Sequence, residues 1–220
     1  MSAPPREVFT PDERRLIRRL RTPEAVQGWL NALPYNTEPR GETLRSFRQV
    51  VAHHTVHCLE AALGAAVVLE QHGYPPRVLS FESIDQLDHV IFVYQRDGRW
   101  GSVARSRDPG LHGRKPQFRR PRDLALSYVD AYVDFTGRIT GYAVYDLGQL
   151  AGYDWRLNDK NMWKVEQVLI DHPHRSIRSS DERIERLRRK YFAFRRLNPG
   201  RKPLYYRGRE RWTALPHEFL

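Results

Sequence analysis

A nearly continuous apolar run covers His57-Cys58-Leu59-Glu60-Ala61-Ala62-Leu63-Gly64-Ala65-Ala66-Val67-Val68-Leu69-Glu70. It is apolar on nearly every side, and a helix with that pattern lies inside a protein. Gly73 follows shortly after it and suits the left-handed conformation in which many helices end. The pattern therefore predicts a buried central helix with Cys58 in its first turn.

Downstream of this helix the hydrophobic pattern changes from a helical period to alternation. It predicts strands over residues 77–81, 89–95 and 100–106, with Asp97-Gly98 as a hairpin turn between the last two. A helix over 121–134 and a strand over 139–145 follow. We therefore expect an α+β fold in which the buried helix that carries Cys58 packs on an antiparallel sheet.

Extra helices are predicted at both ends of the chain. Thr22-Pro23 is a strong start for a helix that runs to Leu33, with Thr22 as its N-cap. Further helical patterns cover residues 11–20, 44–51 and 181–194. Residues 198–220 are expected to form an irregular tail that wraps back on the body. We expect one domain over residues 1–220, with its core at about 22–150 and a basic extension, 151–220, packed on that core.

Length and composition set the class of protein. With 220 residues, 40% of them hydrophobic, the chain is long enough for one real core. It has no run of about 20 apolar residues and no apolar segment at its start, so neither a membrane span nor membrane association is expected. A single cysteine cannot form an internal disulfide and stays reduced most easily in the cytoplasm, which is the expected location.

The net charge is +11 and the isoelectric point is about 10.1. Such a balance favours contact with polyanions or with an acidic partner, although scattered arginines also make an ordinary solvated surface. Arginines and aromatic residues alternate between Arg183 and Arg196, as on a nucleic-acid surface. However, Ile184, Leu187 and Tyr191 follow helical spacing and are better explained as core anchors, so nucleic-acid binding is not predicted.

Cys58 and His89 form a candidate thiol-imidazole site. A helix start stabilises a thiolate, and a neighbouring imidazole takes the thiol proton and later returns it to a leaving group. His89 begins a strand downstream of the cysteine helix, so the fold can bring it beside Cys58. We expect the sulfur about 3–4 Å from a ring nitrogen of His89, and a thiol pKa well below ~8.5. The alternative is a cysteine that only packs in the core.

The sequence resembles the transglutaminase-like (papain-like) superfamily, and in particular its uncharacterised bacterial members. Three segments carry the resemblance: His57-Cys58-Leu59-Glu60-Ala61-Ala62, Asp88-His89-Val90 and Gly98-Arg99-Trp100-Gly101. It covers roughly residues 22–150 and is clearest over 55–108. The resemblance implies a papain-like α+β core and thiol-based cleavage or transfer at an amide, without a cofactor.

One position departs from the family pattern. Such domains usually carry an aspartate four residues after the strand's tryptophan, and counting from Trp100 leads to Ala104. On an extended strand Ser106 and Asp108 share the required face. Ser106 is closer and is our preferred partner for His89. Asp108 carries a negative charge, which suits an imidazole partner better than a hydroxyl, but it lies beside Pro109, where the strand should end.

The histidines near Cys58 also suggest a metal site as an alternative to the thiol site. On one helix, His53 and His57, or His54 and Cys58, are four residues apart and suit zinc. His172 and His174 are further candidate ligands. Because no second dense pair of ligands occurs elsewhere, we predict no metal and no cofactor.

Two functions follow from these observations. The first is a thiol-dependent enzyme that acts on a peptide or an amide-containing small molecule through a thioester on Cys58. The second is a catalytically silent papain-like domain that serves as a basic binding module for nucleic acid or an acidic partner. The alanine at position 104 is what the second function predicts, and the reactivity of Cys58 separates the two.

Overall fold

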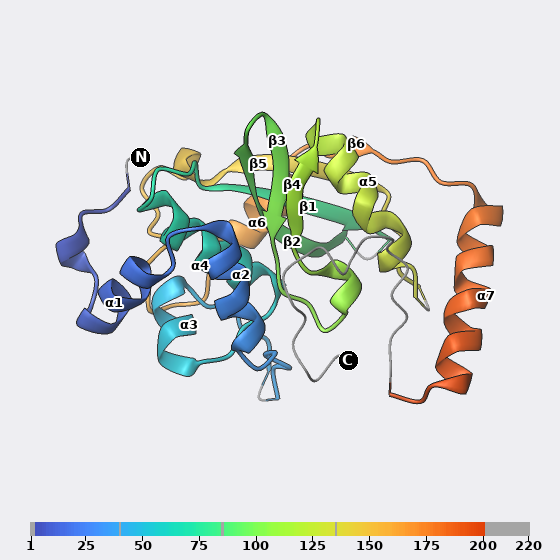
Figure 1. Cartoon of the computed structure of the whole chain (residues 1–220), viewed down its shortest axis with the longest axis horizontal. Helices are drawn as coiled ribbons and strands as arrows, with labels where there is room; N and C mark the ends of the chain where they lie inside the picture. The colour runs from blue at the N-terminus through green and yellow to red at the C-terminus, as the bar shows by residue number, and fades with distance from the viewer. Residues whose placement is uncertain (1–2, 40, 85, 135, 201–220) are drawn as a thin grey trace.

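The structure, a computed structural model, describes residues 3–39, 41–84, 86–134 and 136–200. It is an α+β fold built on a six-stranded antiparallel sheet in the order β4-β3-β2-β1-β5-β6 (Figure 1). The strands are β1 (Arg77–Ser83), β2 (Gln86–Arg96), β3 (Arg99–Val103), β4 (Arg114–Phe118), β5 (Gly141–Asp146) and β6 (Arg175–Ser176). The helices are α1 (Pro11–Arg19), α2 (Pro23–Ala32), α3 (Phe47–His53), α4 (Cys58–Glu70), α5 (Pro121–Tyr132), α6 (Trp163–Asp171) and α7 (Asp181–Leu197). The predicted α+β class is confirmed.

Helix α4 is the centre of the fold. Every residue from Leu59 to Glu70 is buried, because apolar side chains surround the helix on nearly every side. The helix packs on β2 and against α2 and α3. Gly73 has a φ of +86°, the left-handed conformation that glycine adopts without strain, as the sequence predicted.

The sheet separates two hydrophobic cores. Successive side chains of a strand point to opposite faces, so Val78 of β1 joins the core around α4 while Leu79 and Phe81 join the core under α5. His89 of β2 lies directly opposite Phe81 in the β1–β2 pair. His89 therefore shares the face of Phe81.

The predicted hairpin is present, but the predicted length of its second strand is wrong. Asp97 and Gly98 form the turn with φ angles of +52° and +71°. Strand β3 ends at Val103, not at Ser106. Beyond it, Gln27 of α2 accepts a hydrogen bond from the Ala104 N–H at 2.9 Å and donates one to the Ala104 carbonyl at 2.7 Å. These side-chain bonds take the backbone groups that a neighbouring strand would use.

The chain beyond residue 150 contributes to the body of the fold. Trp155 and Val165 are buried in the core around α4, and β6 pairs with β5. Helix α7 lies at one end of the molecule (Figure 1), where Ile184 is buried beside Val133. The tail is predicted over 198–220, of which residues 201–220 lie outside the described residues. Within the described ranges, no helix has both the length and the apolar character needed to cross a membrane.

Candidate active site

Cys58 is the first residue of α4, and its thiol is free and half-buried. His57 precedes it as the N-cap residue in an extended conformation. The start of a helix carries partial positive charge and backbone N–H groups without partners inside the helix. The fold therefore places the sulfur where a negative charge is favoured.

Two imidazoles flank this sulfur. Burial of Cys58 opposes ionisation, but hydrogen bonds with His57 and with His89, together with the charges of both rings, lower the pKa of the thiol to about 5. An ordinary thiol has a pKa near ~8.5. The structure thus brings Cys58 and His89 together, and it adds a second histidine, His57, to which the sequence assigns no role toward the thiol.

His57 is held in one orientation by backbone and carboxylate groups. Its Nε2 lies 2.9 Å from the carbonyl oxygen of Thr43 and 3.5 Å from Oε1 of Glu60. Because a carbonyl oxygen only accepts hydrogen bonds, Nε2 carries a proton and Nδ1 is left for the sulfur. Burial alone would lower the pKa of His57, but the hydrogen bond and charge of Cys58, followed by the charge of Glu60, raise it to about 9.

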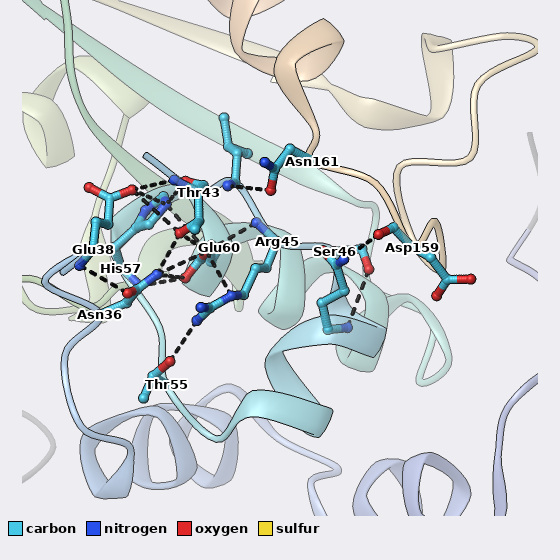
Figure 2. Close-up of polar contacts among 12 residues, drawn as sticks. Asn36, Glu38, Thr43, Arg45, Ser46, Thr55, His57, Glu60, Asp159 and Asn161 are labelled. Atoms are coloured by element: carbon cyan, nitrogen blue, oxygen red, sulfur yellow. Dashed lines mark hydrogen bonds and ion pairs between the residues drawn. The ribbon is translucent and has the colours of Figure 1, made fainter. Parts of the chain in front are cut away.

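Glu60 organises the segment that surrounds His57 (Figure 2). Its side chain is fully buried and accepts hydrogen bonds from the backbone N–H groups of His57 at 2.9 Å and Arg45 at 3.0 Å. It also accepts from the side chains of Asn36 and Thr43, both at 3.3 Å. One buried carboxylate thus ties residues 36–45 to the start of α4 and fixes the place of His57.

A separate set of contacts holds His89. Its side chain is 2% exposed and stacks on Phe81, with 5.9 Å between ring centroids and 11° between ring planes. Its Nε2 lies 3.0 Å from the carbonyl oxygen of Leu111, which follows β3 in a 3-10 turn, Pro109–Leu111. The same reasoning as for His57 places the proton on Nε2 and leaves Nδ1 toward the thiol.

Ser106 and Asp108 take a different place from the one expected. Because β3 has ended, both lie in the loop that leads to Leu111, and among the described residues neither forms a hydrogen bond with His89. The hydroxyl of Ser106 accepts from the Asp108 N–H at 3.0 Å, and Asp108 Oδ1 accepts from the Gly110 N–H at 2.8 Å. They build the turn, whereas a main-chain oxygen holds the imidazole.

The charge of the thiol also acts on Tyr35. Burial, followed by the charge of Cys58, raises the pKa of Tyr35 well above its ordinary value. The guanidinium carbons of Arg105 and Arg107 lie 5.8 and 5.9 Å from the centre of the Tyr35 ring. Tyr35 also lines a cavity of about 400 Å³ together with Glu38 and Thr43. Cys58 does not line this cavity, but Thr43, whose carbonyl oxygen contacts His57, does.

The zinc arrangement considered from the sequence is not formed. Helix α3 ends at His53, His54 has a φ of +55° at the helix cap, and α4 begins only at Cys58. Because His57 lies on neither helix, the pairs four residues apart do not share a helical face. Among the described residues, no group of three or more His, Cys, Asp or Glu side chains is arranged to hold a metal ion.

Sequence reasoning missed the roles of His57, Glu60 and Leu111. The pattern His57-x-x-Glu60 does carry a signal, because a glutamate three residues after the N-cap is the second half of a capping box. It indicates that Glu60 reaches back to His57, as is observed. The carbonyl of Leu111 has no such signal, since every residue has a carbonyl group.

Comparisons with known proteins add little to this geometry. No protein-family model matches the chain, and no curated protein matches it. Among solved structures, the chain is similar to Legionella pneumophila LapG (EGTA-treated), with a TM-score of 0.37 and 14% sequence identity, covering 66% of this chain and 88% of the LapG chain. A likeness at that score carries no argument about fold family or activity.

Proposed function

We propose that this protein is a thiol-dependent enzyme that acts on an amide or acyl group through Cys58. One observation carries the proposal: a half-buried thiol at a helix start has a pKa of about 5 because two imidazoles contact it. Strongly shifted pKa values at partly accessible cysteines are typical of nucleophiles. The order of a cysteine helix followed by an antiparallel sheet with histidine also supports a papain-like core.

The reaction begins with attack of the Cys58 thiolate on the carbonyl carbon of the substrate. A carbon–sulfur bond forms, the carbonyl oxygen takes the negative charge, and the backbone N–H of Cys58 is placed to bind it. His89, which has taken the thiol proton on Nδ1, gives that proton to the departing amine, whose bond to carbon breaks to leave a thioester. His57, with a pKa of about 9, stays cationic at neutral pH and keeps the sulfur ionised.

The thioester then reacts with a second molecule. Attack by water, with His89 taking its proton, releases the acid and makes the protein a peptidase or amidase. Attack by an amine, with His89 again taking a proton, breaks the carbon–sulfur bond and forms a new amide. In both cases Cys58 returns as thiolate, so the cycle needs no cofactor.

The test is covalent capture on Cys58. We expect iodoacetamide to modify Cys58 rapidly at pH 6, and peptide amides offered as substrates to leave an acyl adduct on Cys58 in a mass spectrum of the intact protein. Cys58→Ser is the blank. A thiol that reacts only above pH ~8, as in a free cysteine, would remove the basis of the enzyme proposal.

A second candidate, the basic binding module, rests on a separate cavity. About 560 Å³ of space is lined by Arg120, Arg122 and Arg175 together with His172. Asp123 neutralises Arg120, so Arg122 and Arg175 supply the charge for an acidic peptide. A fluorescent polyglutamate peptide should bind the wild type with an affinity that falls with salt.

Charge reversal tests this second candidate. The double variant Arg122→Glu/Arg175→Glu should lose binding of the polyglutamate peptide, whereas Arg15→Glu, an exposed arginine on α1, should retain it. Equal binding by both variants would show that the cavity is not used.

A further inference from the structure

We propose that Arg114 is a positioning residue for His89, acting through the main chain of residues 110–112. The inference rests on the proposed function, because it explains how a neutral carbonyl group takes the part of a side chain in orienting the imidazole. Arg114 is the first residue of β4 and is only 2% exposed. An arginine held inside a protein is always charged, so its contacts are strong and directional.

The guanidinium group binds the carbonyl groups on both sides of Leu111. Its Nη2 donates to the carbonyl oxygen of Gly110 at 2.6 Å, and its Nη1 donates to the carbonyl oxygen of His112. One planar group therefore fixes the peptide groups before and after the one that contains the Leu111 carbonyl. The carbonyl oxygen of Leu111 lies between them and accepts the proton of His89 Nε2 at 3.0 Å.

Helix α5 holds the guanidinium group in turn. Nε of Arg114 donates to the hydroxyl of Ser127 at 3.2 Å, and the guanidinium carbon lies 3.8 Å above the ring of Tyr128. The hydroxyl of Tyr128 also donates to the carbonyl oxygen of His112 at 3.1 Å. The turn is thus bound by two side chains whose positions are set by α5 and the sheet.

The hydrogen bonds of Arg114 to Gly110 and His112 matter because a carbonyl group, not a carboxylate, orients His89. A carboxylate would attract the imidazole by charge, but a carbonyl oxygen holds it only while its position and direction are correct. The turn at residues 109–111 lies between β3 and β4, and it pairs with no strand in the described part of the chain. By fixing this turn, Arg114 keeps the Nε2–H tautomer of His89 and the aim of Nδ1 at Cys58.

Arg114→Lys tests the idea, because lysine keeps the charge but cannot bridge two carbonyl groups with one planar fork. The measurement is the pH at which iodoacetamide alkylation of Cys58 is half-maximal. His89→Ala should raise this midpoint by about one to two pH units, and Arg114→Lys by about half to one. The double variant should show no more than the shift of His89→Ala, because both changes act on one contact.

Arg156→Lys is the matched control. Arg156 is also a buried arginine, bound to Glu70 at 2.5 and 2.9 Å, far along α4 from Cys58. It should lower the melting temperature by several degrees, as Arg114→Lys does, but leave the alkylation midpoint unchanged. A loss of stability alone therefore does not imitate the expected result.

The outcomes separate the inference from the proposed function. If His89→Ala shifts the midpoint and Arg114→Lys does not, or if their shifts add, the positioning role of Arg114 is refuted while the thiol site stands. If His89→Ala shifts nothing, the proposed function fails and the inference with it. If Arg114→Lys does not fold, Tyr128→Phe decides, since it removes the hydroxyl bonds to His112 and Ser102, keeps the ring under the guanidinium group, and should shift the midpoint in the same direction.

Discussion

Replacing His57 by glutamine removes a cation from beside Cys58 and should raise the pKa of the thiol. The wild-type value of about 5 lies ~3.5 pH units below that of an ordinary thiol, which corresponds to roughly 5 kcal/mol in favour of the thiolate. Hydrogen bonds and charges of His57 and His89 produce this difference against the opposing effect of burial. If the two rings contribute equally, His57→Gln moves the pKa to about 7.

The assay is the full pH profile of alkylation and not the rate at one pH. At pH 6 the thiolate fraction should fall about tenfold. A thiolate with a higher pKa is however a better nucleophile, by about sixfold for two units, so the plateau rate at high pH should rise. The midpoint reports ionisation alone, and the ultraviolet absorbance of the thiolate gives the same quantity without a reagent.

His72→Gln provides the control. His72 lies just beyond the other end of α4, and its Nε2 also contacts a backbone carbonyl, that of Ile17 at 2.8 Å. This variant loses a similar bond without approaching Cys58, so its midpoint should equal that of the wild type. A midpoint for His57→Gln within about half a pH unit of the wild type would refute the role of His57 as partner of the thiolate.

Three further outcomes follow. The lowered pKa of Cys58 stabilises the folded state at high pH, and this contribution is lost as pH falls through about 5. The raised pKa of His57 stabilises the folded state at low pH, and this contribution is lost as pH rises through about 9. Melting temperatures measured across pH 4–10 should therefore be highest between ~6.5 and ~8.5, and Cys58→Ser should flatten this maximum. Glu60→Gln should cost about 2–4 kcal/mol in unfolding free energy, measured with urea, and should lower the pKa of His57, because a neutral amide replaces a fully buried carboxylate. Ser106→Ala removes a bond to the Asp108 N–H in a buried turn, so it should cost about 1 kcal/mol while moving the alkylation midpoint far less than His57→Gln does; a large midpoint shift with unchanged stability would restore Ser106 as a direct partner of the imidazole.

The sequence predicted the parts of the fold that depend on local pattern. Helix α4 follows from a run that is apolar all round, and the β2–β3 hairpin follows from Asp97-Gly98. The end of β3 could not be predicted in this way. It depends on Gln27, 77 residues earlier, whose side chain bonds both backbone groups of Ala104. An alternating pattern carries no information about such a distant partner.

The other elements that sequence reasoning missed have weak patterns for physical reasons. Strand β4 is an edge strand that contains Lys115 and Pro116, residues that suit the border of a sheet but not its centre. Strand β6 has only two residues, too few for any alternation to be recognised.

The site shows the same division. Cys58 and His89 were found from element order, because a helix start and a downstream strand are local features that the fold then brings together. The sequence predicts that a polar side chain orients His89, and Ser106 and Asp108 have suitable polarity on the expected strand face. The structure uses the carbonyl of Leu111 instead, and the choice among main-chain oxygens depends on how the whole turn folds.

The assembly of the thiol's surroundings from distant segments has a consequence for experiments on folding. Cys58 is the one cysteine of the chain, and the residues that ionise it come from the start of α4 and from β2. In an unfolded chain its pKa returns to ~8.5, where less than about 1% is thiolate at pH 6. Even after allowing for the higher intrinsic nucleophilicity of that thiolate, native molecules should be labelled about tenfold faster. Protein thiols generally react faster once unfolding exposes them, whereas here denaturant should slow the labelling. The extent of fast labelling at Cys58 would then measure the fraction of native molecules in a mixture.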